Sequence, residues 1–145
     1  MMKAGWRPLS ITLLAVHLSC LVIMAQAAGS SGRSSAAYAE VLLRRTELAA
    51  EVESVSPDYT DENPKLIDLR YEVAGLDRYL KKMLALNGAD TEKLTQALGK
   101  LIVKRMGLDV ELVRLSRTLK PDHSDYKRAK RRLEIFDSAI KDMFP

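Results

Sequence analysis

The stretch "NPKLIDLRYEVAGLDRYLKKM" at residues 63–83 has the most regular hydrophobic pattern of the chain. Its apolar positions, three or four residues apart, are Leu66, Leu69, Val73, Leu76, Leu80 and Met83. This spacing predicts an amphipathic α-helix with a heptad seam along one side. Asn63 followed by Pro64 predicts its first turn, because asparagine is a good helix cap and the missing N–H of proline costs nothing there. We expect this seam to dock a partner through Leu66, Leu69, Val73, Leu76 and Leu80.

Helical spacing of apolar residues extends over the chain from residue 38 onward. It predicts three further helices, over residues 38–55, about 91–119 and about 124–144. The apolar positions of the last two are Leu94, Leu98, Leu101, Leu108, Leu112, Leu115 and Leu119, then Tyr126, Ala129, Leu133, Phe136, Ile140 and Met143 or Phe144. Arg45 and Arg105 lie on or beside seams, where an arginine usually reaches water or meets a carboxylate. Because alternation with period two is absent, the sequence predicts an all-α fold.

Short breaks rich in Pro, Asp, Asn and Ser separate the predicted helices. Gly88 is suited to a left-handed helix stop, with Asp90 or Thr91 as the next cap. Asp122 or Ser124 is expected to cap the last helix. Short connections make neighbouring helices antiparallel, which favours two tandem antiparallel hairpins at about 38–86 and 90–144. These form either a compact four-helix bundle or extended coiled-coil hairpins that pair with another chain.

The breaks after the first and after the third predicted helix suggest an internal repeat. Superposing Pro57 and Asp58 on Pro121 and Asp122 also aligns Leu69 with Leu133. This pairing predicts a helix, a Pro-Asp turn and a second helix, repeated once. The alternative is that the two turns share these residue types for capping reasons alone.

Residues 1–27 have the pattern of a secretory signal peptide. Lys3 and Arg7 precede a mostly apolar segment, and Ala25 and Ala27 match the small residues before a cleavage site. Residues 28–37 are small and polar, which predicts a flexible leader before a helical domain at 38–145. We therefore expect an exported, periplasmic or extracellular protein. If the segment is not cleaved, it is long enough to act as a membrane anchor.

The small numbers of cysteine and histidine limit the metal sites that the expected mature protein could form. Cys20 is the only cysteine of the chain, and cleavage would leave His123 as the sole histidine. A zinc site of cysteine and histidine is therefore not expected, and no pattern predicts a catalytic residue, a cofactor or another metal. His123 lies beside Asp122 and Asp125, but without a nucleophile we interpret it as an exposed turn residue. We predict that the protein is not an enzyme.

The segment "PDYTDENPKLIDLRYEVAGLD" resembles the helical-hairpin segment in the periplasmic region of bacterial polysaccharide chain-length determinants. It is similar also to the coiled-coil turns of periplasmic adaptor proteins in export systems. In these families a loop of the type Tyr/Leu-x-x-x-His/Asn-Pro precedes an aliphatic-x-x-Leu-Arg sequence. The matching residues, all within 57–77, are Tyr59, Thr60, Asn63, Pro64, Leu66, Leu69, Arg70 and Leu76. The resemblance implies a periplasmic helical hairpin that is used in assembly.

The sequence "KRAKRR" at residues 127–132 is the densest cluster of charge. Its cations, Lys127, Arg128, Lys130, Arg131 and Arg132, are expected opposite the apolar stripe of the last helix. They form either a solvated face, partly neutralised by Glu134, or a contact surface for anionic lipid or an anionic glycan. Loss of the signal peptide would lower the formal net charge of +4 by two, because Lys3 and Arg7 are its only charged residues. Net charge therefore gives no reason to expect nucleic acid as a partner.

These observations predict an exported, non-catalytic structural or interaction protein of the cell envelope. We expect it to use its apolar seams for self-association or for docking a protein partner, because four helices with few aromatic residues make a thin core. The alternative is a protein that binds a polyanion or anionic lipid through the basic last helix. Such binding would weaken steeply with salt, whereas docking through leucine seams would not.

Overall fold

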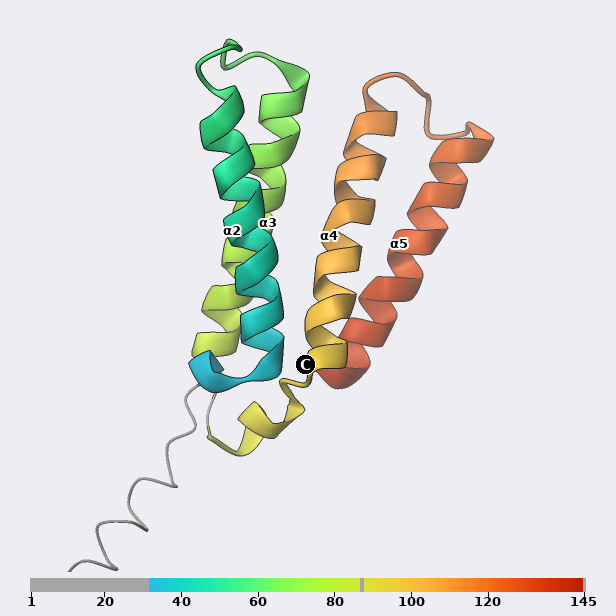
Figure 1. The fold of residues 1–145 in the computed structure, drawn as a ribbon. Helices are drawn as coiled ribbons and strands as arrows, with labels where there is room; N and C mark the ends of the chain where they lie inside the picture. Colours follow the sequence, from blue (N-terminus) through green and yellow to red (C-terminus); the bar gives the residue numbers. More distant parts are fainter. Residues whose placement is uncertain (1–31, 87, 145) are drawn as a thin grey trace, which may run out of the picture. The chain divides into compact units, whose positions relative to one another are not determined.

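The computed structural model describes residues 32–86 and 88–144, and helices are its only regular secondary structure. In chain order these are the 3-10 helix η1 Gly32–Ser34, α2 Ala36–Val55, α3 Pro64–Leu84, the 3-10 helix η2 Gly88–Lys93, α4 Gln96–Ser116 and α5 Ser124–Met143 (Figure 1). No strand occurs in these two ranges, so the predicted all-α class is confirmed. The predicted signal peptide, residues 1–27, lies outside the described residues.

Side chains just before each long helix accept hydrogen bonds from its first turn. Asn63 Oδ1 accepts from the Lys65 amide at 2.9 Å, and Pro64 occupies the first turn of α3, as predicted. Ser35 and Thr95 cap α2 and α4 in the same way. α5 differs from the prediction, because neither Asp122 nor Ser124 is its cap. The ring nitrogen Nδ1 of His123 accepts from the Asp125 amide at 3.2 Å and takes that role.

The connection between α3 and α4 also differs from the prediction. α3 ends at Leu84, and the described residues include no glycine with a positive φ angle, so Gly88 is not a left-handed stop. Gly88 instead begins η2, in which the Thr91 hydroxyl donates to the Gly88 carbonyl at 2.6 Å. Because this 3-10 helix occupies residues 88–93, α4 begins only at Gln96, behind the cap Thr95.

The last residues of the predicted leader are part of the packed structure. Gly32 is buried against the end of α3, where an added Cβ atom would lie 2.5 Å from the Met83 carbonyl oxygen. Ala37 is completely buried, and its amide donates to the Leu94 carbonyl at 3.2 Å. The small residues Gly32 and Ala37 predicted a flexible segment. In the structure their small size instead permits close packing.

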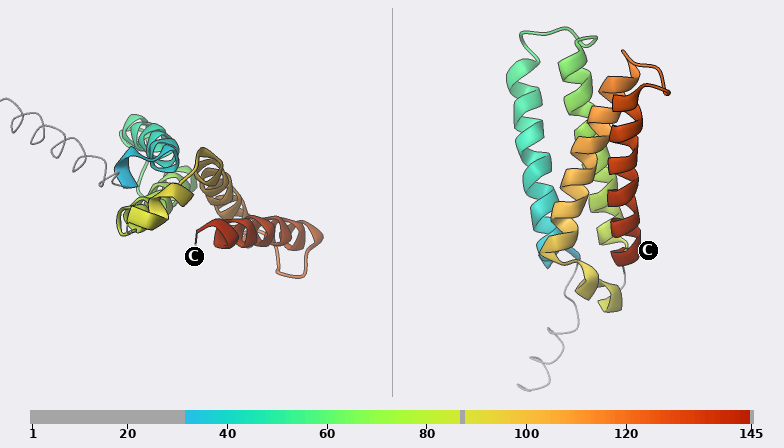
Figure 2. Two further views of the ribbon diagram at one scale, coloured as in Figure 1. Left: turned by 90° about the horizontal axis from the view of Figure 1, so that it is seen from below. Right: turned by 90° about the vertical axis from the view of Figure 1, so that its right-hand side faces the viewer.

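The long helices form two adjacent pairs, α2 with α3 and α4 with α5. α4 also packs against both α2 and α3, so it lies in the groove between them (Figures 1 and 2). α5 packs mainly against α4, and the view along the helices in Figure 2 shows it on the outer side of α4. α2, α3 and α4 therefore share one core, which the C-terminal end of α5 joins through Ile140 and Phe144, while the rest of α5 lies outside it.

Apolar side chains of α2, α3 and α4, together with Ile140 and Phe144 at the end of α5, fill this core. Its fully buried members are Val41, Leu48, Leu66, Leu76, Met83, Leu98, Ile102 and Met106. On α4 the buried row is Leu98, Ile102 and Met106, whereas Leu101 of the predicted seam is only partly buried. The reason is that α4 has two packing sides, since it contacts the first helix pair as well as α5. A single predicted seam cannot describe such a helix.

Gly99 is a point of close approach between α2 and α4. A Cβ atom there would lie 2.8 Å from Glu40 Cβ, 2.9 Å from Ala37 Cα and 3.0 Å from the Ala37 carbonyl oxygen. Two of these atoms belong to the backbone of α2, which no change of rotamer can move. The missing side chain at position 99 therefore allows α4 to lie against α2.

The helix boundaries reveal an internal repeat. α2 and α4 begin at Ala36 and Gln96, and α3 and α5 begin at Pro64 and Ser124, so one constant offset in residue number relates the second helix pair to the first. We call this relation the structural repeat. Residues that are identical under it are Ala37 and Ala97, Arg45 and Arg105, Leu48 and Leu108, Glu51 and Glu111, Ser56 and Ser116, Asp77 and Asp137, Lys81 and Lys141, and Met83 and Met143. The two helix pairs are thus related in sequence as well as in structure.

The predicted superposition of Pro57 on Pro121 is therefore wrong. Pro57 follows the end of α2 at Val55 closely, whereas Pro121 lies just before the start of α5 at Ser124. The turn between α2 and α3 and the turn between α4 and α5 form the tips of the two helix pairs. The Pro-Asp sequence lies at the start of the first tip and near the end of the second. The similarity of the two Pro-Asp sequences reflects the residue preferences of turns, which was the alternative explanation.

Glycine replacement tests the close approach of α2 and α4. We expect Gly99→Ala to lower the free energy of unfolding by roughly 1–3 kcal/mol, because the new methyl group meets backbone atoms of α2. Gly107→Ala in the same helix is the matched control: no atom lies within 4 Å of its added Cβ. This control should raise stability by about 0.5–1 kcal/mol, the usual gain for alanine in an exposed helix. Urea denaturation measures both, and equal effects would contradict the packing described.

Candidate functional site

An arginine-aspartate ion pair connects the two helices of each pair. Arg45 Nε donates to Asp77 Oδ1 at 3.0 Å between α2 and α3. Arg105 Nε donates to Asp137 Oδ1 at 2.8 Å between α4 and α5. The two ion pairs occupy equivalent positions of the structural repeat. The sequence-based expectation that each seam arginine reaches water or meets a carboxylate is confirmed.

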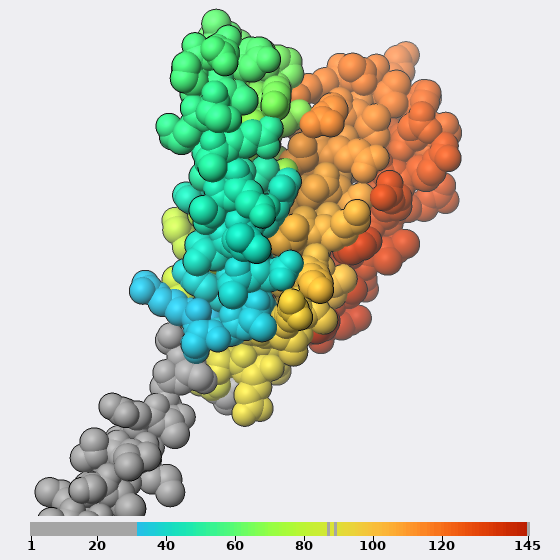
Figure 3. Space-filling view, in the orientation of Figure 1, coloured from blue at the N-terminus to red at the C-terminus, as the bar shows by residue number. Residues whose placement is uncertain are grey.

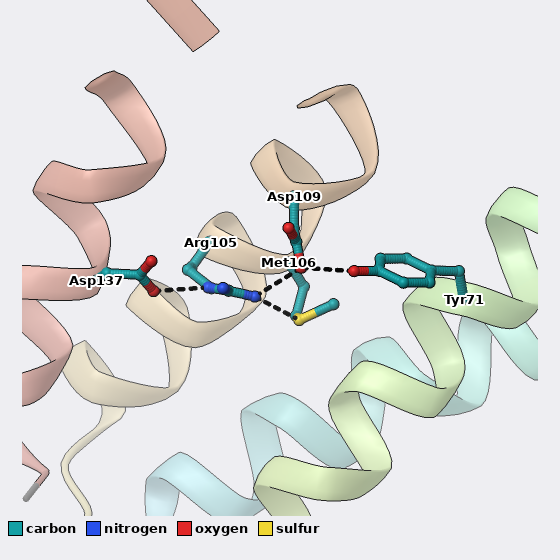
Figure 4. A network of polar contacts seen from close by, with 5 residues as sticks. All are labelled: Tyr71, Arg105, Met106, Asp109 and Asp137. Carbon is teal, nitrogen blue, oxygen red and sulfur yellow. Dashed lines mark hydrogen bonds and ion pairs between the residues drawn. The ribbon is translucent and has the colours of Figure 1, made fainter. Parts of the chain in front are cut away.

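Arg105 also belongs to a polar network that joins α3, α4 and α5 (Figure 4). Its Nη1 donates to Asp109 Oδ2 at 2.8 Å, and the Tyr71 hydroxyl donates to the same oxygen at 3.1 Å. Burial by itself would lower the pKa of Arg105, but the hydrogen bond to Asp137 and the nearby acidic groups raise it overall. Arg105 is therefore a permanent cation, and the network fixes the three helices in register.

Burial raises the pKa of the Tyr71 phenol, and its hydrogen bond to the negatively charged Asp109 raises it further. The pKa of Tyr79 is raised as well, chiefly by burial. Both phenols are thus held neutral at ordinary pH. No sequence pattern indicated Tyr71 or Asp109, because they come from different helices and neither belongs to a motif.

On α3, two buried carboxylates face arginines of neighbouring helices. Asp68 forms ion pairs with Arg117 at 2.7 Å and with Arg114 at 3.2 Å, both at the end of the α4 segment. Glu72 accepts a hydrogen bond from Arg44 of α2 at 3.2 Å. The two acids are only 6% and 7% exposed. Asp68 is consequently part of the interface that holds the end of the α4 segment, and Glu72 is part of the interface between α3 and α2.

The equivalent side of α5 is basic and exposed. Asp68 and Glu72 correspond to Arg128 and Arg132 under the structural repeat. All five predicted cations, Lys127, Arg128, Lys130, Arg131 and Arg132, are exposed on α5. Three of them form ion pairs: Arg128 with Asp125 at 2.8 Å, Arg132 with Glu111 at 3.6 Å and Lys130 with Glu134 at 3.9 Å.

A hollow lies beside this basic side, on the face of the molecule formed by α2, α4 and α5 (Figure 3). It has a volume of about 590 Å³ and is lined by Glu40, Arg44, Glu72, Lys100, Val103, Lys104, Gly107, Leu108, Glu111 and Arg132. Lys100 and Lys104 of α4 thus add two cations near Arg132. The sequence analysis missed them, although their spacing of four places them on one side of a helix.

Exposed large apolar side chains occur on α2, α3 and α5, and those of α3, Ile67 and Leu84, are each 41% exposed. Leu42 and Leu43 of α2 are 40% and 60% exposed, and Ile135 of α5 is 67% exposed. Ile135 is equivalent to Gly75 of α3, which is buried against Met106 of α4. We define the open α4–α5 face by Ala97, Lys100, Lys104, Arg128, Arg131, Arg132 and Ile135, all of which are exposed.

The predicted partner seam is not available to a partner. Leu66, Leu69, Leu76 and Leu80 are buried, and Val73 is partly buried. Leu69, Leu76 and Leu80 belong to the same hydrophobic core as Val41 of α2 and Ile102 of α4. The seam is therefore filled by the chain's own helices, and this corrects the expectation that it forms a docking surface.

Within residues 32–86 and 88–144, no cluster of His, Cys, Asp or Glu has the arrangement needed to hold a metal ion. None of the helices in these ranges combines the length and hydropathy required of a membrane span. A comparison with known proteins gave no significant match to a protein-family model, a curated protein or a solved structure.

The raised pKa of Tyr71 predicts a dependence of stability on alkaline pH. A phenol whose folded-state pKa lies above the ordinary value of 10.0 contributes its full stabilisation below that pH and loses it as the pH rises through the raised pKa. The free energy of unfolding should therefore fall as the pH rises above about 10. Tyr71→Phe should make this fall smaller, whereas Tyr59→Phe at an exposed position should not. Identical pH profiles for the two variants, measured by urea denaturation, would exclude this contribution.

Proposed function

We propose that this chain is an exported, non-catalytic interaction protein of the cell envelope, built from two tandem antiparallel helical hairpins. Its proposed docking surface is the open α4–α5 face. One observation carries this proposal: α4 fills the groove of the first helix pair, whereas the residues along the equivalent groove of the second pair are exposed.

The composition of the open α4–α5 face supports a role in binding. Ile135 is a large apolar side chain that is 67% exposed, and Arg128, Arg131 and Arg132 precede it on α5 at helical spacing. An apolar residue within a polar and charged rim is typical of protein interaction surfaces, and arginine is enriched there. Arg132 and Ile135 are exposed, whereas their counterparts are buried, Glu72 against Arg44 of α2 and Gly75 against Met106 of α4.

The sequence of residues 1–27 supports export, because Lys3, Arg7 and Ala25 to Ala27 fit the parts of a signal peptide. The resemblance of residues 57–77 to periplasmic hairpin segments supports a place in the cell envelope. Part of this loop pattern, Tyr/Leu-x-x-x-His/Asn, occurs again at Leu119 and His123, which the structural repeat pairs with Tyr59 and Asn63, but Ser124 stands there in place of the proline. The complete pattern on which the resemblance depends therefore belongs to the first turn.

A photoreactive amino acid at position 135 tests the docking surface in the cells that produce the protein. We expect irradiation to yield covalent adducts at position 135, because the side chain there is exposed on the proposed surface. Lys81 is the matched control: it is exposed on α3, which is not part of the open face. Mass spectrometry of the recovered protein should also show an N-terminus at Ala28.

Equal labelling at positions 135 and 81, or no adduct at position 135, would contradict docking through this face. An intact N-terminus in the recovered protein would contradict cleavage and leave an anchored form. The two results are independent, because the first concerns the surface and the second concerns the leader.

A second candidate function is binding of an anionic polymer or anionic lipid surface through α5. The observation in its favour is that all five cations are exposed and only three of them have an ion-pair partner among the described residues. Such a surface attracts polyanions through counterion release, so its affinity falls steeply with salt.

Charge removal tests the second candidate. We expect replacement of Arg128, Arg131 and Arg132 by Gln to reduce retention on a heparin column and co-sedimentation with anionic vesicles. The control replaces Arg33, Arg78 and Lys81 by Gln, which removes the same charge at exposed positions away from α5. If both triple variants elute at the same salt concentration, the binding depends on net charge and not on the α5 surface.

A further inference from the structure

We infer that the occupant of the open α4–α5 face is α2 of a second copy of this chain, docked head to tail. The contact would reproduce between copies the packing of α4 on α2 and α3 within one chain. This inference rests on the proposed function, since it names the partner of the same face.

The interface of α4 with α2 and α3 within one chain is the model for the contact between copies, and we call it the template. Ala37 of α2 lies against Gly99 of α4, and Gly75 of α3 lies against Met106 of α4. At the tip end, Asp68 of α3 forms ion pairs with two arginines at the end of the α4 segment. Three kinds of contact thus hold α4 in its groove: a close backbone approach, an apolar side chain over a small residue, and paired charges.

The structural repeat transfers the groove side of this template to α4 and α5. Ala37, Gly75 and Asp68 correspond to Ala97, Ile135 and Arg128. All three of these counterparts are exposed, and the hollow of about 590 Å³ lies along the same side of α4. A helix that docks there would cover residues that no described helix of this chain covers.

The same repeat transfers the other side of the template to α2. Gly99, Ile102 and Met106 of α4 pack on the first helix pair, and Val110 continues their row one turn further; their counterparts on α2 are Ala39, Leu42, Thr46 and Ala50. The four residues of α4 are buried, whereas those of α2 are exposed. Small residues at positions 39 and 50 permit a close helix approach, and Leu42 offers an apolar contact. α2 therefore presents an uncovered version of the side that α4 buries.

Charge complementarity favours a second copy over an unrelated helix. The second half of α2 carries Glu47, Glu51 and Glu53 and has no basic residue in its last turn. The first half of α5 carries the cations, and both segments lie at the tip end of their pairs (Figure 1). Arg114 and Arg117, the partners of Asp68, correspond to Ser54 and Pro57, so a second copy docked by the template would place its Ser54 beside Arg128, with Glu53 as the adjacent carboxylate. Opposite charges at such a contact stabilise it and exclude other registers.

This contact joins different surfaces of the two copies, so each added copy presents a new open α4–α5 face. Such a heterologous contact generates an open row of subunits unless a rotation closes it into a ring. The expected products are therefore dimers, trimers and longer species, and not a single symmetric dimer.

Engineered cysteines test the arrangement in the full-length chain with Cys20→Ser. Met106 and Gly75 correspond to Thr46 and Ile135, so a thiol introduced at position 46 of one copy should lie against a thiol introduced at position 135 of the next. We expect an equal mixture of Thr46→Cys and Ile135→Cys proteins to form a disulfide dimer under mild oxidation. The variant with both changes should form a ladder of multimers on a non-reducing gel. Each single variant alone should form no disulfide dimer and should run as a monomer on the same gel.

A mixture of Lys81→Cys and Ile135→Cys proteins is the matched control and should form no more dimer than either protein alone. The contact should also respond to charge. Arg128→Glu should reduce cross-linking roughly tenfold, and Glu53→Lys on the partner should restore it.

Absence of the ladder at the highest soluble concentration would overturn the inference, as would disulfides between identical positions only. Adducts at position 135 in cells without any ladder would mean that the open face binds something other than a second copy, and would leave the proposed function standing. Absence of both would overturn the proposed function as well.

Discussion

The close approach of α4 to α2 at Gly99 is the constraint on which the remaining packing depends. Because no side chain separates Gly99 from the backbone of Ala37, α4 enters the groove between α2 and α3. Its depth in that groove brings Met106 onto Gly75 and the end of the α4 segment onto Asp68. α5, which packs mainly on α4, is then left as the outer helix, with one side uncovered.

The two helix pairs share the arginine-aspartate ion pair between their helices but carry opposite charges on equivalent sides. Arg45 with Asp77 and Arg105 with Asp137 connect the helices of each pair in the same way. On the groove side, however, Asp68 and Glu72 of α3 are replaced by Arg128 and Arg132 on α5, and an acidic buried surface becomes a basic exposed one. The ion pair between the helices contributes to the stability of both pairs. The change of charge at the open groove is the feature on which the proposed function depends.

Several local features could be predicted from the sequence because they depend on residues close together in the chain. The apolar spacing of α3 and the cap at Asn63 are of this kind, and the carboxylate partners of Arg45 and Arg105 follow from the cost of an unpaired charge in a seam. The structural repeat could not be obtained from the Pro-Asp sequences, since turn preferences place them at opposite ends of the two tips. Burial of the Leu66 to Leu80 seam within the chain could not be predicted. A heptad pattern has the same spacing whether it packs against another chain or against α2 and α4 of the same chain. His123 as a cap and the network of Tyr71 with Asp109 are likewise visible only when the helices are placed in space.

The most direct test of this account is a nuclear Overhauser measurement on protein with isotope-labelled methionine methyl groups. The docking of α4 in the groove of α2 and α3 predicts strong cross-peaks between the Met106 methyl group and the Gly75 α-protons, and between the α-protons of Gly99 and Ala37. Cross-peaks from Met106 to α5 instead, or none to α3, would contradict the account. In that case α4 would not fill the first groove, and the open face of the second pair would have no internal counterpart.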